Sequence, residues 1–289
     1  MKGLLVVNEF LHLTKFDEIH NLLQVAFLKE GIALELKTNA QIVVEVDSDA
    51  LFAYDFVLFW DKDIMLAKHL ENKGLKVFNS ASAIDICDDK QKTAIFLENY
   101  NIKMPKTIFA PFTYENIGYT NSNFLQNVAQ TLGFPLVVKE AKGSFGKQVY
   151  LVDNMQDLCV KIAEIGAKPI LFQQFIKSSF GIDTRIQVVG GKVVATVKRI
   201  GKEGDFRANV TNGGKMVAFK PSKEFEQMAL YVCQILGVDF AGVDILFGAN
   251  NEPIFCEINS NAHFKNILDA TGINVADCLA QYIKGKIAL

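Results

Sequence analysis

The chain has 289 residues, of which half are hydrophobic and 21% are charged, and its formal net charge is −2. This length predicts two or three domains with ample apolar material for their cores. The near-neutral charge gives no reason to expect a nucleic-acid partner, which demands a strongly basic surface. The sequence contains no uncharged apolar run long enough to span a membrane.

The first 88 residues alternate between strand and helix patterns. Strands are predicted at 4–7, 32–36, 56–59 and 76–78, and helices at 16–26 and 64–71. This alternation predicts a small parallel α/β unit. A further helix is predicted to begin at Asp88 and Asp89, whose acids suit a helix N-terminus, and to run towards Tyr100.

Two further units are predicted beyond Pro105. Helices at 121–132 and 155–165 flank strands at 136–139 and 148–152, and further strands are predicted at 170–176, 184–189 and 192–199. A helix begins after Pro221 and ends at Gly237, and a last helix runs through 275–283. The five cysteines show neither zinc spacing nor a disulfide framework, which favours a reduced, cytoplasmic protein.

Two apolar strands near the C-terminus carry acids, Asp244 in the first and Glu257 in the second. The turn-rich segment between them predicts an antiparallel hairpin, and strand alternation places Glu257 and Asn259 on one face. Because an unpaired buried carboxylate costs several kcal/mol, these oxygen ligands suggest a Mg²⁺ that carries nucleotide phosphates. The alternative is that each acid is solvated at a strand end or paired with a lysine.

A loop with two glycines and several lysines separates the strands predicted at 136–139 and 148–152. It is not a P-loop, because Gly143 and Gly146 are only three apart, Gln148 replaces the hydroxyl residue and a strand follows. A glycine hairpin that folds over phosphates, with Lys139 as a cation, is one interpretation. A hairpin with solvated lysines is the other.

Three arginines accompany a glycine-rich stretch between these features. Arg185 shares a strand face with Asp183, Arg199 ends the next predicted strand, and Arg207 follows in the stretch 201–214. Guanidinium groups bind carboxylates and phosphates in a bidentate manner. Solvated arginines at the rim of a loop are the simpler alternative; the order of glycine loop, arginines and acids favours a site.

That order, over about residues 75–275, resembles the ATP-grasp ligases, and most closely the RimK-type (α-L-glutamate ligase-like) amino-acid ligases. The resemblance rests on six segments in order: Asn79 with Asp89, Lys90 and Pro105; 135–139 with 143–147; 172–176; 183–185; 193–214; and 241–259. It implies an α/β fold of ATP-grasp type. A parallel α/β domain, 1–88, would precede two α+β subdomains, 89–172 and 173–289, that grip ATP between them.

The resemblance also implies roles for individual residues. ATP is expected to contact Lys90, Lys139, Gly143, Ser144, Phe145, Gly146, Lys147, Gln174, Phe175, Ile176, Asp183 and Asn209. Two Mg²⁺ or Mn²⁺ ions are expected on Asp244, Glu257 and Asn259, while Arg185, Arg199 and Arg207 would act on the phosphoryl group and the substrate carboxylate.

The implied activity is ATP-dependent ligation of a carboxylate and an amine through an acylphosphate, adding an amino acid such as glutamate to a peptide, protein or small molecule. Another ATP-grasp peptide or natural-product ligase, and a non-catalytic ATP-binding regulator, are the alternatives. Relatives of this type are commonly dimers or tetramers, so a homo-oligomer is expected.

Two positions depart from the family pattern. Gln174 replaces a usual glutamate, a mild change if the hinge acts through its backbone. The usual Ser-Pro-Gly is replaced by Ser260–Lys265 on the acceptor side, so the substrate is expected to differ. His263 in this segment could orient an amine or a carboxylate, although a structural histidine is the favoured interpretation.

Overall fold

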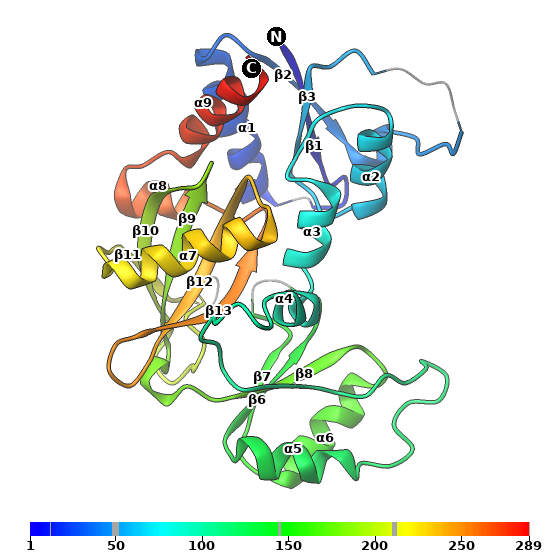
Figure 1. Ribbon diagram of the computed structural model, residues 1–289, viewed down its shortest axis with the longest axis vertical. Coiled ribbons are helices and arrows are strands. Elements are labelled where there is room, and N and C mark those ends of the chain that lie inside the picture. Colours follow the sequence, from blue (N-terminus) through cyan, green and yellow to red (C-terminus); the bar gives the residue numbers. More distant parts are fainter. Residues whose placement is uncertain (12, 48–51, 144–145, 210–212, 289) are drawn as a thin grey trace.

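The computed structural model describes residues 1–11, 13–47, 52–143, 146–209 and 213–288. It contains three sheets, and Figure 1 shows them arranged along the long axis of the molecule, with the first at the top and the second at the bottom. The third sheet lies between them. The fold is therefore α/β with three sheet-centred units.

The N-terminal unit is the parallel unit expected from the sequence. Its sheet has the order β2-β1-β3-β4, and all three pairings are parallel. The strands are β1 (Lys2–Val7), β2 (Ala33–Thr38), β3 (Phe56–Phe59) and β4 (Val77–Phe78). The helices are α1 (Thr14–Lys29), α2 (Ile64–Asn72) and α3 (Ala81–Cys87), and the 3₁₀ turn η1 spans Asn39–Gln41. Helix α3 was not predicted from the sequence.

The helix predicted from Asp88 is α4 (Lys90–Phe96), which ends before Tyr100. Asp89 is its N-cap, because its side chain accepts hydrogen bonds from the backbone N–H groups of Gln91 and Lys92. The backbone N–H of Lys90 donates to the carbonyl of Ala141, so this helix begins against the second unit.

The second sheet is antiparallel, with the order β5-β8-β6-β7. Its strands are β5 (Thr107–Phe109), β6 (Leu136–Glu140), β7 (Val149–Val152) and β8 (Ile170–Gln174), and its helices are α5 (Phe124–Leu132) and α6 (Met155–Ile165). These helices bury their apolar faces in a core made with the sheet. Since β8 runs through residue 172, the subdomain boundary expected there falls inside a strand.

The third sheet has the order β11-β10-β9-β12-β13 and is antiparallel throughout. Its strands are β9 (Ile182–Val189), β10 (Lys192–Ile200), β11 (Lys215–Ala218), β12 (Phe240–Phe247) and β13 (Pro253–Asn259). The turn η2 spans Lys177–Ser179, and the helices are α7 (Lys223–Leu236), α8 (Lys265–Thr271) and α9 (Val275–Ile287). Strand β11 and helix α8 were not predicted from the sequence.

The first and third units share one core. In Figure 1, α9 lies beside α1, and apolar residues of both helices pack in a cluster with residues of β3, β9, β10 and β12. Asn79 also joins the two units: its amide donates to the carbonyls of Phe240 and Ser260 at 2.8 and 3.0 Å, and its oxygen accepts from the N–H of Asp239 at 2.6 Å. These two units therefore form one packed body.

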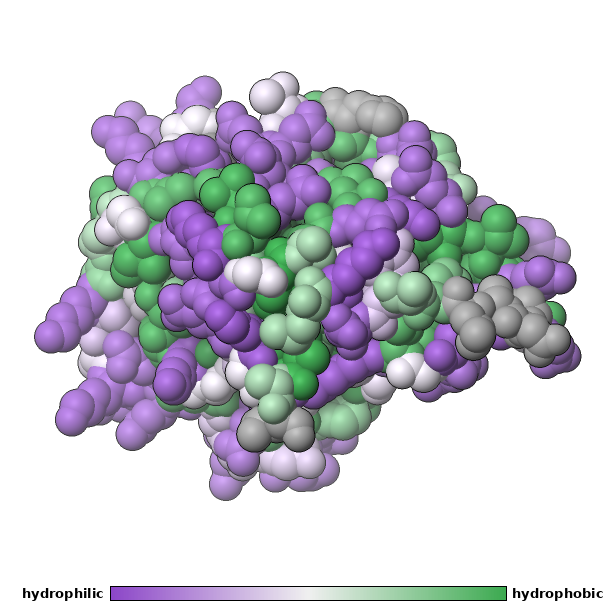
Figure 2. Space-filling view, turned by 90° about the horizontal axis from the view of Figure 1, so that it is seen from above, coloured by the Kyte–Doolittle hydropathy of each residue, from purple (hydrophilic) through white to green (hydrophobic). Residues whose placement is uncertain are grey.

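The exposed end of the N-terminal unit has a mixed surface. Seen from that end, hydrophilic side chains predominate and apolar ones lie among them (Figure 2). Within the described ranges, none of the helices is long and apolar enough to cross a membrane.

Candidate active site

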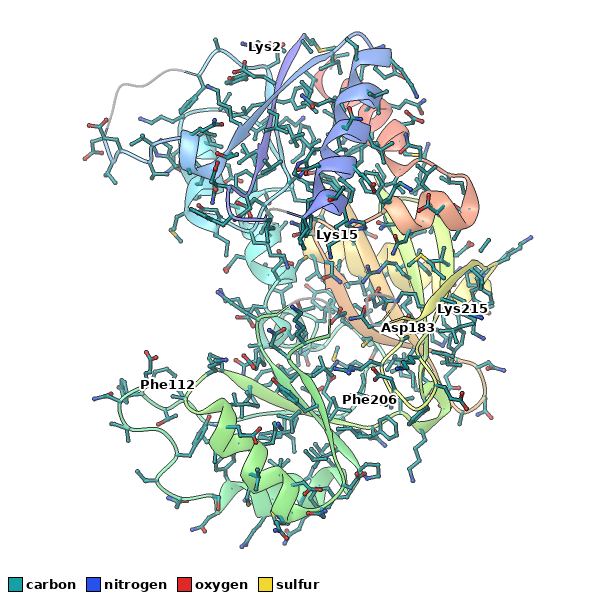
Figure 3. The ribbon with its side chains drawn as sticks, turned by 180° about the vertical axis from the view of Figure 1, so that it is seen from behind. Lys2, Lys15, Phe112, Asp183, Phe206 and Lys215 are labelled. Atoms are coloured by element: carbon teal, nitrogen blue, oxygen red, sulfur yellow. The ribbon has the colours of Figure 1, made fainter. Side chains whose placement is uncertain are left out.

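A cavity of about 930 Å³ lies where the three units meet. Residues of the glycine loop, the hinge after β8, the third sheet and the N-terminal unit all line it. Figure 3 shows Lys15, at the start of α1, and Asp183, on β9, in the middle part of the molecule. This volume lies at the upper end of the range for small-molecule sites, so the cavity has room for more than one reactant.

The two acids of the C-terminal hairpin face each other across the β12–β13 ladder. Asp244 pairs directly with Glu257, and Gly242 pairs with Asn259. The register shifts after Asp244, because Ile245 pairs with Phe255 and leaves Cys256 as the extra residue of a β-bulge. The bulge allows Phe255 to lie in the core while Glu257 faces the cavity.

Arginine and aspartate side chains alternate across the third sheet. Arg185 donates from Nε and Nη2 to the two carboxylate oxygens of Asp244, both at 2.7 Å. Arg199 makes a bidentate pair with Asp183 and also contacts Asp244 at 2.7 Å. The strand register places these partners opposite each other, as Asp244 with Arg185 and Asp183 with Arg199.

This charge row shifts the pKa values of its members. Burial raises the pKa of Asp183, although Arg199 opposes the shift. Burial alone would lower the pKa of the Arg199 guanidinium, but the carboxylates of Asp183 and Asp244 hold it well above its ordinary value. Both groups of the Asp183–Arg199 pair therefore depend on one another for their charge.

Glu257 is a half-buried carboxylate surrounded by cations. Burial raises its pKa, but Lys90, Lys139, Arg185 and Arg199 more than offset this effect and bring the pKa to about 2. Among the described residues, the only hydrogen bond to Glu257 is a long one from Asn259, at 3.4 Å. The carboxylate is therefore ionised and still has lone pairs for another ligand.

Two lysines border the same part of the cavity. Lys139, on β6, has only 6% of its surface exposed, and the sole hydrogen bond of its ammonium within the described part of the chain is to the sulfur of Cys256 at 3.7 Å. Lys90 Nζ reaches the carbonyl of Gly143 at 3.4 Å. A buried ammonium group that forms no salt bridge within the described residues suits an anionic ligand such as a phosphate.

The glycine loop contacts the arginine-bearing loop that follows β10. Arg207 Nη1 donates to the carbonyl of Gly146 at 2.9 Å and pairs with Asp205 at 2.9 Å. Gly146 has a positive φ of 68°, and a Cβ there would lie 3.0 Å from the amide nitrogen of Asn209. The positive φ therefore favours glycine here, and a Cβ would also crowd the Asn209 side chain.

The hinge after β8 lines the cavity through Gln174, Phe175 and Ile176. The backbone N–H of Gln174 donates to the carbonyl of Lys106 at 2.9 Å, so this donor is already used within the protein. The ring of Phe175 lies 6.2 Å from that of Phe206, edge to face, which ties the hinge to the arginine-bearing loop. An adenine ring at the hinge would rely on the remaining backbone groups.

The structure brings most of the expected site residues to one cavity. Lining residues that the sequence singled out are Lys90, Lys139, Gly143, Gly146, Gln174, Phe175, Ile176, Asp183, Arg185, Arg199, Arg207, Asn209, Asp244, Glu257 and Asn259. Lys147 is not among the residues that line the cavity, although its neighbours Gly146 and Gln148 are. Ser144 and Phe145 lie outside the described residues.

Several residues that line the cavity were not predicted from the sequence. Cys256 reaches the cavity because of the β-bulge, which the sequence pattern does not reveal. Asn8 directly follows β1, and Asp61 lies two residues after β3. A signal for both existed, because ligands of parallel sheets bind at the carboxyl ends of the strands.

His263 lines the cavity and also joins two units. Its Nε2 lies 3.1 Å from the carbonyl oxygen of Lys15, and its ring packs edge to face on Phe16. Burial lowers the pKa of His263 to about 4, and the cations Lys15, Arg185 and Lys265 add to this effect. The neutral imidazole therefore acts at least as a structural link to α1.

The donor set fits a Mg²⁺ ion that is shared with phosphates. Asp244, Glu257 and Asn259 carry oxygen atoms on one sheet face, which is the chemistry that Mg²⁺ prefers. Both oxygens of Asp244 are paired with arginines in this structure, so this carboxylate would exchange an arginine contact for the metal. No group of three His, Cys, Asp or Glu side chains suited to a metal occurs in the part of the chain that the structure describes. Phosphate oxygens would therefore complete the coordination.

Comparison with known proteins gives the same family by sequence. The RimK-like ATP-grasp domain matches residues 87–283. The chain is 34% identical to β-citrylglutamate synthase B of Danio rerio over 89% of its own length and 64% of that protein. It is 33% identical to human N-acetylaspartylglutamate synthase A over 77% of the chain and 56% of the relative, and 38% identical to a probable α-L-glutamate ligase of Legionella pneumophila over 76% and 70%.

Solved structures show the same fold at low sequence identity. A RimK-domain ATP-grasp protein of Sphaerobacter thermophilus superposes with a TM-score of 0.75 at 18% identity, covering 98% of this chain and 99% of that one. D-alanine–D-alanine ligase of Bacillus anthracis superposes with a TM-score of 0.77 at 16% identity, covering 100% and 98%. The expected ATP-grasp fold is confirmed. With the domain match and these relatives, the chain belongs to the RimK-like ATP-grasp family.

Proposed function

We propose that this protein is an ADP-forming carboxylate–amine ligase that uses Mg-ATP to join an amino acid such as glutamate to a carboxylate-bearing acceptor. The observation that carries the proposal is Glu257, an ionised carboxylate opposite Asp244 and beside four cations, at the meeting point of three units. The relatives named as synthases and ligases support it, although the chain spans only 64% and 56% of two of them.

The proposed chemistry proceeds in two steps. A substrate carboxylate oxygen attacks the γ-phosphorus of ATP, which gives an acylphosphate and ADP. The amine of the second substrate then attacks the acyl carbon, the C–O bond to phosphate breaks, and the amine loses its proton as phosphate leaves. This chemistry depends on positioning and on charge neutralisation.

Each part of the site has a role in this proposal. Lys90 and Lys139 neutralise phosphate oxygens, and Asp244, Glu257 and Asn259 hold Mg²⁺ or Mn²⁺, which would offset the charge on the phosphates. Arg199 and Arg207 stabilise the transferring phosphoryl group, and Arg185 orients a carboxylate. The glycine loop, held by Arg207 through Gly146, would exclude water from the acylphosphate.

We extend the proposal to the setting of the enzyme. All five cysteines are free thiols, which suits a reducing cytoplasm. A homo-oligomer, either a dimer or a tetramer, is proposed from the family resemblance, and light scattering on the purified chain measures it. Neither nucleic acid nor membrane is proposed as a partner.

The test measures ADP and phosphate release from Mg-ATP across a panel of amino acids and carboxylate acceptors. Mass spectrometry follows each active combination, and the Asp244→Asn/Glu257→Gln variant serves as the blank. Substrate-dependent ADP with a product mass equal to the two reactants minus water supports the ligase and identifies its substrates. Tight ATP binding without turnover on a panel that includes peptides and proteins would instead support a regulatory ATP-binding protein.

A further inference from the structure

The N-terminal sheet presents its carboxyl edge to the cavity. Asn8 follows β1 and Asp61 lies two residues beyond β3, and these strands are neighbours, with Val6 paired to Phe59. In Figure 3, Lys2 at the start of β1 lies at the far end of the molecule, whereas Lys15, just after the β1–α1 loop, lies at its centre. Asn8 and Asp61 both line the cavity from this edge.

Asp61 is a buried carboxylate that forms no salt bridge within the described residues, although the charge of the neighbouring Lys62 acts on it. Only 5% of its surface is exposed, and it accepts hydrogen bonds from the Asn8 amide at 3.2 Å and from the backbone N–H of Lys62 at 2.7 Å. The ammonium of Lys62 is directed to Asp88, 2.9 Å away. Burial raises the pKa of Asp61, and these hydrogen bonds only partly oppose the shift.

A purely structural role for Asp61 would not require its negative charge. Asp61 does fix the chain after β3, and Asn8 in turn accepts from the backbone N–H of Phe10 at 2.9 Å. A neutral amide at position 61 could still accept the bond from the Lys62 N–H. Since a buried carboxylate without a salt bridge costs several kcal/mol, the negative charge itself needs another explanation.

We propose that Asp61, held in place by Asn8, binds an ammonium group of the carboxylate-bearing substrate. This inference rests on the proposed ligase function and deepens it. The reacting amine must be deprotonated when it attacks the acyl carbon, so we assign the ammonium at Asp61 to another amine. The reaction leaves this second amine unchanged.

The surrounding residues define the substrate class further. Lys15, on α1, and Lys265, on α8, line the same cavity as Asp61, and Lys265 also pairs with Asp269. Their positive charges suit a carboxylate, while Asp61 suits an ammonium. The acceptor is thus a zwitterion with a free amine, such as an amino acid or a peptide N-terminus, rather than an N-acylated or purely anionic acid.

The experiment compares acceptors that differ only in N-acetylation, for example glutamate with N-acetylglutamate and a dipeptide with its N-acetyl form. We expect the wild-type kcat/KM to be at least tenfold higher for the free amine. Asp61→Asn should abolish this preference by raising KM for the free amine, with the acetylated acceptor unaffected. Asp63→Asn is the matched control: it removes a charge from the same loop, and asparagine can still cap α2 as Asp63 does.

Three results would overturn the proposal. The first is an equal kcat/KM for both members of each pair in the wild type. The second is an equal loss of kcat/KM for both members in Asp61→Asn, which would indicate that Asp61 has only a structural role. The third is a loss of preference in Asp63→Asn as well. Urea unfolding of each variant checks that its stability matches the wild type, so that a folding defect is not mistaken for a binding effect.

A binding experiment distinguishes a failure of the ammonium site from a failure of the proposed ligase activity. If every acceptor fails to give ADP, the ligase function fails, and the same pairs are titrated calorimetrically with a non-hydrolysable ATP analogue and Mg²⁺ present. Tighter binding of the free amine in the wild type, lost in Asp61→Asn, supports the ammonium site without catalysis. Equal heats for both members of a pair refute it.

Discussion

Glu257 illustrates how neighbouring charges determine the state of a single side chain. Burial raises the pKa of this carboxyl, yet the four cations around it leave the pKa at about 2. The carboxylate is thus kept ionised, and the cations are kept together by it. A substitution at this position changes both the metal ligand set and the balance of charge in the cavity.

The first prediction concerns the charge of Glu257. Glu257→Gln should lower kcat/KM for ATP-dependent ligation by roughly 10²–10³-fold, because preorganised charge at a reacting centre has that value, and it should raise the Mg²⁺ concentration needed for half-maximal rate. ADP release measured against Mg²⁺ concentration tests both effects. Glu252→Gln is the control: this acid lies in the turn of the same hairpin and pairs with Lys103. A similar loss in both variants would contradict the assignment.

The second prediction concerns the pH dependence of stability. The pKa of His263 is about 4 in the folded chain, below its ordinary value of 6.5. The unfolded chain therefore takes up the proton first as the pH falls, so this stabilisation is complete above pH 6.5 and is lost as the pH approaches 4.

His263→Asn should accordingly reduce the fall in unfolding free energy between pH 6.5 and 4 by about 2 kcal/mol. Urea unfolding of the wild type and the variant at several pH values gives the difference in their unfolding free energies. The carboxylates titrate in both proteins, so their contribution cancels in this difference. His20→Asn is the comparison, since burial lowers the pKa of His20 while Asp17 opposes the shift. An unchanged slope in His263→Asn would show that the imidazole is not buried as described.

At the scale of the elements, Asn79 connects the end of β4 to β12 and to the segment after β13. Besides its three bonds to Phe240, Ser260 and Asp239, its oxygen accepts from the N–H of Phe240 at 3.2 Å. Its side chain is 1% exposed, so water cannot replace these bonds without rearrangement. One amide therefore satisfies backbone groups that two units leave unpaired.

Asn79→Ala should reduce the free energy of unfolding by about 3 kcal/mol, because it leaves buried backbone groups without partners. The shift in urea midpoint, with the slope unchanged, gives this value. Asn72→Ala at the exposed end of α2 is the matched control and should change stability by less than about 0.5 kcal/mol. Equal effects would mean that the contacts of Asn79 contribute no specific stabilisation.

Sequence patterns predicted the elements with strong periodicity and missed those that depend on their surroundings. The strand at 56–59 and the helix at 155–165 were predicted with the bounds that the structure shows. The short helices α3 and α8 and the edge strand β11 carry too few residues for a pattern, and their packing stabilises them. The alternation along β13 placed Glu257 and Asn259 together but could not reveal the bulge at Cys256.

The candidate site was predictable where residues act through charge. Lysines, arginines and acids in a fixed order indicated the cavity, whereas the pairing of Arg185 with Asp244 and of Arg199 with Asp183 depends on strand register. The contribution of the N-terminal unit could not be read from these motifs, because the edge that carries Asn8 and Asp61 meets the cavity only through the packing of whole units.

At the scale of the molecule, the units are unequally connected. The core of the middle unit contains residues only between 108 and 172, whereas another core includes residues from β1 and α1 through to α9. The middle unit is therefore expected to open or unfold without disrupting the other two. Such independence is what a site between units needs for reactants to enter.

Urea unfolding should consequently show two transitions, with the middle unit as one and the joined first and third units as the other. Hydrogen exchange followed by mass spectrometry assigns each transition to its peptides. Mg-ATP should raise the midpoint of the first transition, because a ligand that bridges units stabilises their closed arrangement. A single transition with uniform exchange across all peptides would contradict this division.

The β-bulge has a consequence for how this site could vary among homologous chains. Because Cys256 is an additional residue in the ladder, its side chain belongs to neither the apolar face nor the row of metal ligands. Replacing it changes the width of the cavity beside Lys139 while the pairing of Asp244 with Glu257 persists. The strand thus separates the residue that shapes the cavity from the residues that carry charge, and selection can alter one without disturbing the other.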